Sequence, residues 1–235
     1  NYEKICVNQK YQVKDQFKKK ILTFSDKAKV AYEVQKETEK AMLHLIKFAK
    51  SKTKTDNLCI SGGVALNCVA NNILKDTRLF KNIYINPAAS DTGIPLGGVY
   101  HGYFHYYKNS KRKTTLSPYL GLSYSKKEVA KSLKLLKKNK KIKIHKDKNL
   151  NRTLKLLLEN KAVGFFQGRS ETGPRALGNR SILMSPIKEK NRYILNKKIK
   201  LREEFRPFAP IVLKEEVDNF FQFKGESPYM LYACK

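Results

Sequence analysis

The chain has 235 residues, 41% of them hydrophobic, which is enough for one large domain or two small ones with real cores. No run of about 18 apolar residues is present, which excludes a membrane-spanning helix, and no signal segment is recognisable, so we expect a cytoplasmic protein. The net charge of +29 suggests a polyanionic partner, but only nine of the 49 cationic residues are arginine, a bias more typical of codon usage than of a nucleic-acid surface.

The first elements along the chain are a helix and a strand. Residues 27–50 carry apolar or small residues at helical spacing, and Ser25 precedes them as a plausible cap. A short buried strand is expected over 58–61. A Gly-Gly turn then leads into a helix that ends near Leu74.

The same order of elements follows. A strand is expected over 83–86, then a polar loop, then a helix that starts near Pro95. Helices that alternate with strands predict an α/β domain with a partly parallel sheet.

The second half begins after a polar, basic stretch over 108–118, the best candidate for a linker. Ser125 and Glu128 have the spacing of a capping box at the start of a helix. The expected elements are helices over 126–138, 151–160 and 187–200 and strands over 141–145, 162–167, 180–186 and 209–213. This half is therefore also predicted to be α/β.

The motif "SGGVALN" is the first candidate site. A strand, Gly62-Gly63 and a helix can present backbone N–H groups to an anion or a nucleotide. Asn67 could add a polar contact. The alternative, a tight turn without a ligand, is equally compatible with this short pattern.

The motif "AASDTG" is the second candidate. Asp91 follows a strand, where a carboxylate can bind a metal ion, although a helix N-cap is favoured on spacing alone. His101 and His105 share a helix face, but no glutamate lies between them, and a surface or packing role is favoured over a metal site. The four cysteines form no C-x-x-C pair, which favours reduced thiols.

The strongest chemical signal is residues 168–182, "GRSETGPRALGNRSI", which we call the arginine loop. Glycines recur every five residues in it, so a compact loop is expected. Arginine in a lysine-rich chain indicates sites where a planar, bidentate donor is needed. An oxyanion pocket is therefore predicted, although at least one arginine is expected to pair with a carboxylate such as Glu171. The cations of this region are Arg169, Arg175, Arg180, Arg192, Lys200, Arg202 and Arg206.

Four motifs in this order resemble the carbamoyltransferase family of nodulation and antibiotic biosynthesis. They are "LCISGGVALNCVANNIL", "INPAASDTGIPLGG", "GRSETGPRALGNRSIL" and "KLREEFRPFAPIVL". The similarity extends from about residue 27 to 230. The chain is interpreted as an internal fragment, because the family's first phosphate loop and its paired metal-binding histidines have no counterpart here.

The resemblance implies an α/β fold made of two domains. Residues 1–110 are expected to form the C-terminal part of an actin-like (ASKHA) domain that binds nucleotide and metal. Residues 111–117 are the expected linker, and 118–235 a YrdC-like domain that forms carbamoyl-adenylate and is truncated at its C-terminus.

The resemblance also implies roles for individual residues. Asp91 matches a metal-binding aspartate of the family. The cations that match the basic lining of the carbamoyl-phosphate and ATP pocket are Arg169, Arg175, Arg180, Lys200, Arg202 and Arg206. The residues assigned to nucleotide binding are Gly62, Gly63, Val64, Asn67, Gly93, Gly168, Asn179 and Ser181.

The reaction that the resemblance implies is an ATP-dependent O-carbamoyl transfer from carbamoyl phosphate to a hydroxyl of a sugar or other small metabolite. ATP, Mg²⁺ and a divalent metal such as Fe²⁺ are the expected cofactors, and a homodimer is left open. Two alternatives remain: an enzyme that makes threonylcarbamoyl-adenylate for tRNA modification or binds nucleic acid, which the net charge would suit, and a non-catalytic binding protein.

Overall fold

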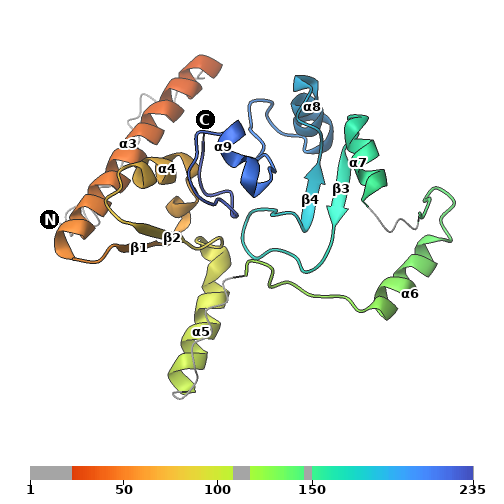
Figure 1. The fold of residues 1–235 in the computed structure, drawn as a ribbon, viewed down its shortest axis with the longest axis horizontal. Coiled ribbons are helices and arrows are strands. Elements are labelled where there is room, and N and C mark those ends of the chain that lie inside the picture. Colours follow the sequence, from red (N-terminus) through yellow and green to blue (C-terminus); the bar gives the residue numbers. More distant parts are fainter. Residues whose placement is uncertain (1–22, 108–116, 146–149, 235) are drawn as a thin grey trace. The chain divides into compact units, whose positions relative to one another are not determined.

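The computed structural model describes residues 23–107, 117–145 and 150–234 (Figure 1). The chain divides into two compact units, Asn1–Thr53 and Lys54–Lys235. In the described residues, a single long helix represents the first unit, and strands β1 to β4 all lie in the second. The structure contains both helices and strands, which confirms the mixed α/β class predicted from the sequence.

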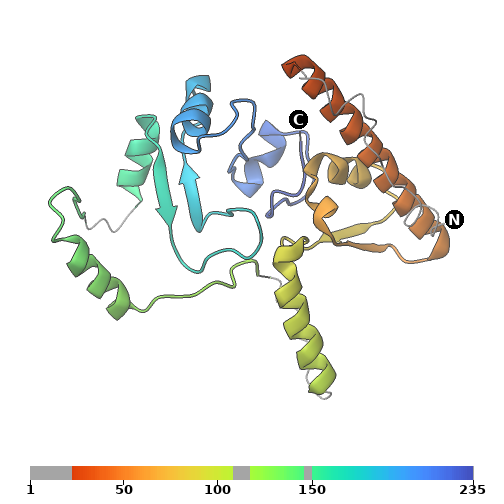
Figure 2. The ribbon, with the colours of Figure 1, turned by 180° about the vertical axis from the view of Figure 1, so that it is seen from behind.

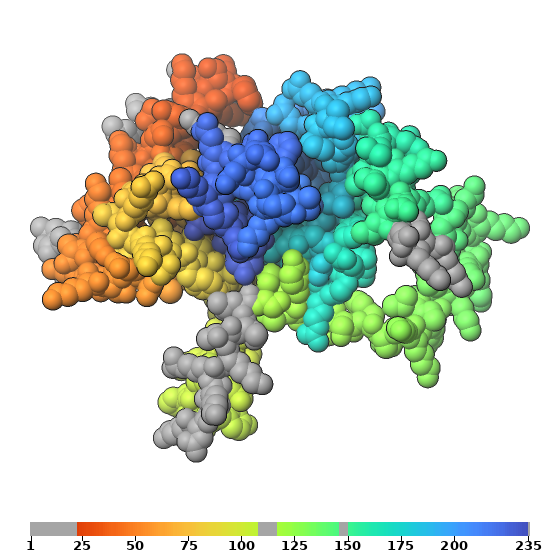
Figure 3. Space-filling model, viewed as in Figure 1, coloured from red at the N-terminus to blue at the C-terminus, as the bar shows by residue number. Residues whose placement is uncertain are grey.

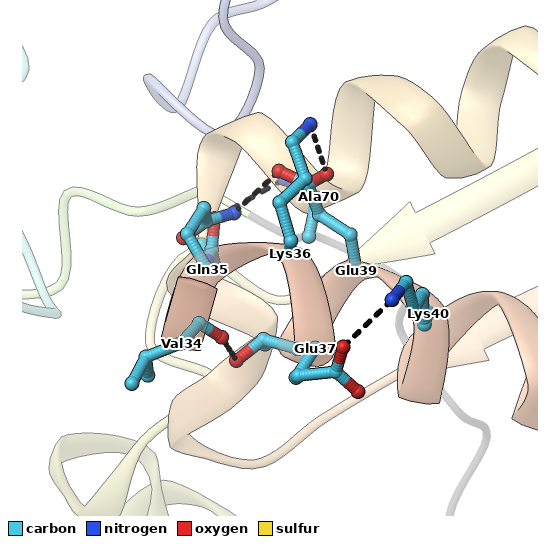
Figure 4. A network of polar contacts seen from close by, with 9 residues as sticks. Val34, Gln35, Lys36, Glu37, Glu39, Lys40 and Ala70 are labelled. Carbon is cyan, nitrogen blue, oxygen red and sulfur yellow. Dashed lines mark hydrogen bonds and ion pairs between the residues drawn. The ribbon is translucent and has the colours of Figure 1, made fainter. Parts of the chain in front are cut away.

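Helix α3 spans Phe24–Lys52. It begins with a capping box, in which Thr23 caps the helix and exchanges hydrogen bonds with Asp26, so the cap expected at Ser25 is wrong by two residues. Side chains one turn apart also pair along it. Figure 4 shows Gln35 and Lys36 donating to the two oxygens of Glu39, at 3.0 and 2.9 Å.

The second unit opens with a parallel pair of short strands, β1 (Asn57–Ile60) and β2 (Asn82–Ile85). Between them the chain forms a 3₁₀ turn, η1 (Gly63–Leu66), and helix α4 (Cys68–Asp76). Both strands and their parallel pairing agree with the prediction. The continuous helix expected after the Gly-Gly turn is wrong, because the chain leaves η1 in an extended conformation at Asn67 before α4 begins.

After β2, a second 3₁₀ turn, η2 (Asp91–Gly93), leads directly into helix α5 (Ile94–Tyr106). Pro95 lies in the first turn of α5, where its missing N–H removes no hydrogen bond. Helix α5 contains no Lys, Arg, Asp or Glu, and none of its residues is buried in the described structure.

A small apolar core covers one face of the β1–β2 sheet. Ala65, Ile85 and Ala89 are buried there together with Leu231, which comes from the other end of the chain. Its neighbour Ala233 donates a backbone hydrogen bond of 3.1 Å to Cys68. Figure 3 shows this C-terminal segment, in blue, lying against the gold surface of α4.

The remaining elements of the second unit are mainly short. An antiparallel pair of strands carries the arginine loop between its two members, and Figure 2 shows helix α7 beside the first strand. The helices and strands are α6 (Lys126–Leu136), α7 (Asn151–Leu158), β3 (Val163–Phe166), β4 (Arg180–Leu183), α8 (Glu189–Tyr193) and α9 (Val217–Phe220). A π-helical turn, η3 (Ile194–Ile199), continues α8, and a 3₁₀ turn, η4 (Lys214–Glu216), precedes α9.

Two predicted strands are wrong. Residues 141–145 and 209–213 have the apolar pattern of strands, but neither segment pairs with another strand in the described structure. A strand needs a partner for its backbone groups, and local pattern cannot supply one. The capping box at Ser125 and the helices and strands predicted from 151 to 200 are confirmed, with ends shifted by a few residues.

The predicted division into domains 1–110 and 118–235 stays a prediction. Most of the linker expected over 111–117 lies outside the described residues. The described parts on either side of it belong to the same compact unit.

Candidate functional site

The glycine turn after β1 is a strained position that only glycine tolerates well. Gly62 has a φ of 98° and donates its N–H to the carbonyl of Ala89, at 2.7 Å. The N–H groups of Gly63 and Val64 have no protein acceptor in the described part of the chain. Both residues are exposed, so their N–H groups can still serve a ligand.

Asn67 has a structural task. Its side-chain oxygen accepts a hydrogen bond of 3.1 Å from the N–H of Ala70 and thereby caps α4. The nucleotide contact expected of this side chain stays a prediction.

The Asp91 turn contains a second glycine, Gly93, that packs tightly against the preceding chain. A Cβ on Gly93 would lie 2.1 Å from the carbonyl oxygen of Ala88, so the chain packs against this position too closely for any side chain. Asp91 itself is exposed at the start of η2, and Ser90 holds the N-cap position. The N-cap alternative for Asp91 is therefore wrong, and its carboxylate is accessible.

These two turns border a cavity of about 550 Å³. Ser61, Gly62, Asp91 and Gly93 contribute to its wall, and α5 adds Leu96, Gly97 and Tyr100. Two segments from beyond α5 complete it, namely Ser117, Pro118, Leu120 and, from the arginine loop, Thr172. The volume lies in the range of sites for small molecules.

Glu171 organises the arginine loop. One of its carboxylate oxygens accepts hydrogen bonds from the N–H groups of Leu177, Asn179 and Arg180, at 2.7, 2.8 and 3.2 Å. Burial alone would raise the pKa of this carboxyl, but the backbone donors outweigh it and lower the pKa. The pairing expected between Glu171 and an arginine side chain is thus replaced by bonds to the backbone.

Arg180 serves the carbonyl groups of the same loop. Its guanidinium donates to the carbonyl oxygens of Gln167, Gly168 and Asn179, at 2.6, 3.2 and 2.9 Å. The guanidinium carbon lies 3.5 Å from the centre of the Phe166 ring, a cation–π contact. These contacts make Arg180 a structural residue in this conformation.

Arg175 joins the arginine loop to the glycine turn. Its Nη2 donates to the carbonyl of Leu66 at 3.0 Å, across 109 residues of sequence. Its Nε is buried and has no hydrogen-bond partner. Nearby, a Cβ on Gly173 would lie 2.6 Å from the carbonyl oxygen of Pro87, so the loop packs directly on the chain that follows β2.

Arg169 differs from its two neighbours. Its side chain is exposed and makes no hydrogen bond or ion pair with another described residue. Its carbonyl accepts from Asn179, at 2.7 Å. Ser181 accepts from the N–H of Gly178 at 3.0 Å, so the side chains of Asn179 and Ser181 both brace the loop.

Two of the three cations after η3 bind other side chains of the protein. Arg202 donates to Asn196 at 2.7 Å and lies over the Phe208 ring, and Arg206 pairs with Glu203 at 2.7 Å. Lys200 is exposed. Thr172 is the arginine-loop residue that lines the cavity, and none of the six predicted cations contributes to its wall. Their common role in binding anions stays a prediction.

The two histidines of α5 stack on each other, with ring centres 5.7 Å apart, on an exposed part of the helix. Within the described ranges, no group of three or more His, Cys, Asp or Glu side chains is arranged to hold a metal ion. Asp91 is therefore a single candidate ligand here.

Comparison with known proteins now adds a decisive observation. A family model described as "Carbamoyltransferase N-terminus" matches residues 1–100, and one described as "Carbamoyltransferase C-terminus" matches residues 154–235. The chain belongs to the carbamoyltransferase family. The cavity therefore combines residues of both modules, because Gly62 and Asp91 come from the first and Thr172 from the second.

Several curated proteins are similar to most of this chain. An uncharacterized protein of Synechocystis is 40% identical over 87% of this chain and 34% of its own length. The nodulation protein NolO of Bradyrhizobium diazoefficiens is 34% identical over 88% of this chain and 38% of its own length. The nodulation protein U of Sinorhizobium fredii is 33% identical over 75% of this chain and 29% of its own length. The chain thus spans about a third of the length of these relatives.

The sequence analysis missed two buried asparagines of this chain. Asn71 is 1% exposed and donates to the carbonyls of Ala65 and Leu231, at 2.7 and 3.0 Å. Asn196 is fully buried and donates to the carbonyls of Glu204 and Arg206. An asparagine among apolar residues in a helix was the available signal, but its distant partners leave no local pattern.

No described helix is long and apolar enough to cross a membrane.

Proposed function

We propose that this chain forms part of an ATP-dependent O-carbamoyltransferase, which takes the carbamoyl group from carbamoyl phosphate and transfers it to a hydroxyl of a sugar or another small metabolite. The proposal rests on one observation above all. A cavity of about 550 Å³ is bordered by the glycine turn and the Asp91 turn of the N-terminal module and by Thr172 of the C-terminal module.

The glycine turn suits the phosphate groups of a nucleotide. Gly63 and Val64 carry exposed N–H groups without a protein acceptor in the described structure, and such groups can donate to phosphate oxygens. Gly62 allows a ligand to approach the backbone closely because it has no Cβ. ATP and carbamoyl phosphate are substrates in this proposal.

The arginine loop suits the chemistry of two phosphorylated substrates. When a triphosphate and a carbamoyl phosphate meet, several negative charges must be stabilised together, and arginines of this loop would supply the positive charge for it. Activation of the carbamoyl group as an adenylate, with release of pyrophosphate, divides one difficult acyl transfer into two easier steps. The cavity then limits the loss of the activated group to water.

Asp91 fits one position of a metal site. Its exposed carboxylate lies on the cavity wall and would supply one oxygen ligand to Mg²⁺ or to a divalent metal such as Fe²⁺. The described residues provide no cluster of three or more ligands around it. No step of the proposal is therefore assigned to a metal.

Release of pyrophosphate tests the proposal directly. The protein that contains this chain is incubated with ATP, and pyrophosphate is measured with and without carbamoyl phosphate. We expect release that depends on carbamoyl phosphate. Release that depends instead on threonine and bicarbonate would identify the threonylcarbamoyl alternative, and release under neither condition would contradict adenylate formation.

A further inference from the structure

Helix α6 is exposed to solvent over its whole length. All of its 11 residues are exposed, and none is buried. Among the residues that the structure describes, the hydrogen bonds of its side chains are limited to the capping box of Ser125 and Glu128. The helix is thus fixed at its start by its cap, and both of its faces are accessible.

One face of α6 is apolar. Val129, Leu133 and Leu136 are spaced by four and three residues, so their side chains lie along the same side of the helix. These side chains are 47%, 38% and 44% exposed. We call these three residues the α6 stripe. An apolar phase that covered the stripe would remove this surface from water, which is favourable.

Lysines accompany the α6 stripe and continue beyond the end of the helix. Residues 126–143 contain nine lysines and one glutamate. Lys127, Lys131 and Lys134 repeat the spacing of the stripe on the other side of α6. None of the lysines of α6 forms an ion pair with another described residue. Their charge is therefore available to an anionic partner.

An anionic lipid surface suits the stripe and the lysines together. Its headgroups attract lysine, and the boundary of its acyl region covers apolar side chains, so a basic amphipathic helix lies in the plane of such a surface. The long lysine side chains can extend from the helix to the level of the headgroups.

Two other partners suit these residues less well. Nucleic acid would leave the α6 stripe uncovered, and residues 126–143 contain no arginine or aromatic side chain that could stack on bases. A groove of an acidic protein would hold the helix. It would not hold the lysine-rich chain over 137–143, which is not helical. A flat anionic surface can contact both parts at once.

We propose that α6 is a docking site for an anionic lipid membrane, on which the helix lies with the α6 stripe toward the acyl chains and its lysines at the level of the headgroups. This inference goes beyond the proposed carbamoyl transfer and does not depend on it. It concerns attachment to the surface of a membrane, and no described helix crosses one.

Co-sedimentation with lipid vesicles tests the inference on the protein that contains this chain. One set of vesicles is made of phosphatidylcholine alone, and the other also contains phosphatidylserine. A leucine variant, Leu133→Ala with Leu136→Ala, shortens the α6 stripe. An α6 lysine variant, Lys127→Gln with Lys131→Gln, removes two charges from the helix.

The matched control is Lys29→Gln with Lys47→Gln, which removes the same charge from exposed positions of α3. Thermal unfolding is recorded for every variant, so that a change in binding can be separated from a change in stability. The four side chains substituted in α6 are exposed, and we therefore expect an unchanged unfolding midpoint.

We expect the unsubstituted protein to bind vesicles with phosphatidylserine at least about tenfold more tightly than vesicles of phosphatidylcholine alone. The leucine variant and the α6 lysine variant should each weaken this binding about tenfold. The α3 control should change it by less than about twofold, because its lysines lie outside the docking helix. A higher salt concentration should weaken binding by the unsubstituted protein.

The controls are needed because a net charge of +29 would by itself attract anionic vesicles. Equal losses in the two lysine variants, with no effect of the leucine variant, would indicate such general attraction and overturn the inference. Failure of the unsubstituted protein to bind either kind of vesicle would overturn it as well. Binding of RNA in place of vesicles, measured by fluorescence anisotropy and weakened in the α6 lysine variant, would reject lipid and identify nucleic acid as the partner.

Discussion

Glu171 and Arg180 divide the polar groups of one loop between them. The carboxylate accepts from three N–H groups and the guanidinium donates to three carbonyl groups. Each of these two charged side chains therefore forms its hydrogen bonds with the backbone and not with the other side chain. An irregular loop has few hydrogen bonds of its own, and these two residues replace the ladder that a helix or a sheet would supply. The loop can therefore be rigid without regular structure.

This arrangement predicts a specific dependence of stability on pH. The folded protein lowers the pKa of Glu171 below its ordinary value of 4.5. The contribution of the carboxylate is therefore fully present above pH 4.5 and is lost as the pH falls through the lower, folded-state pKa. Glu171→Gln lacks this contribution at every pH.

We therefore expect Glu171→Gln to be less stable than the unsubstituted chain at neutral pH, and the difference to shrink in acid. Urea unfolding at pH 7 and at several values below 4.5 measures it. Glu159→Gln is the control, because this exposed carboxylate follows α7 outside the loop. A stability difference that is constant with pH would contradict the role of the ionised carboxylate.

The composition of the sequence identified the arginine loop but not the role of each arginine in it. Arginine is scarce in the chain and concentrated there, which drew attention to residues 168–182. Arg175, however, donates to a carbonyl 109 residues away. Glu171 accepts from backbone N–H groups, which do not depend on the type of the residue that carries them. Such contacts depend on the fold, and no spacing of residues in the sequence indicates them.

At the scale of elements, the junction of η2 and α5 depends on where its glycines lie. Gly93 is in close contact with the carbonyl oxygen of Ala88, whereas a Cβ on Gly98 would meet no atom within 4 Å. Both residues look alike in the sequence "DTGIPLGG". Only Gly93 is required by packing.

We expect Gly93→Ala to destabilise the protein by about 1–3 kcal/mol, because the added methyl group forces the Asp91 turn away from Ala88. Gly98→Ala should instead stabilise the protein by up to about 1 kcal/mol, because alanine has a higher helix propensity than glycine at an exposed position within a helix. Urea unfolding of both variants gives the comparison. Equal stability of the two would mean that the turn has room to adjust.

Elements whose signals are local were predicted well. The capping box at Ser125 and Glu128 is visible in four residues and is present in α6. The segments 141–145 and 209–213 were wrongly predicted as strands, because a strand forms only beside a neighbouring strand. The 3₁₀ turn before α4 and the π-helical turn after α8 were also missed, since the helical periods are too similar to separate over so few residues.

At the scale of the whole molecule, the core under the β1–β2 sheet is completed by residues from the C-terminal family module. Leu231 is 3% exposed and packs with Ala65, Ile85 and Ala89. Asn71 bonds its carbonyl across 160 residues. The two modules recognised in the sequence are therefore not separate in their packing, although the order of the motifs along the chain suggested a boundary between them.

Leu231→Ala tests this dependence. We expect it to lower the free energy of unfolding by about 2–5 kcal/mol, because it leaves a cavity in the small core. Hydrogen exchange should become faster in β1, β2 and α4, far from the substitution in sequence. Ile211→Ala, at a side chain that is 78% exposed, is the matched control. Exchange that accelerates only around Leu231 itself would contradict the shared core.

The closure of this core by Leu231 has a consequence for synthesis. A ribosome makes the glycine turn and both strands of the sheet long before it reaches residue 231, 160 positions after Asn71. Until then Ala65, Ile85 and Ala89 lack the side chain that completes their core. The nascent chain therefore carries this apolar patch uncovered until residue 231 has been made, and we expect a chaperone to find it accessible in that interval.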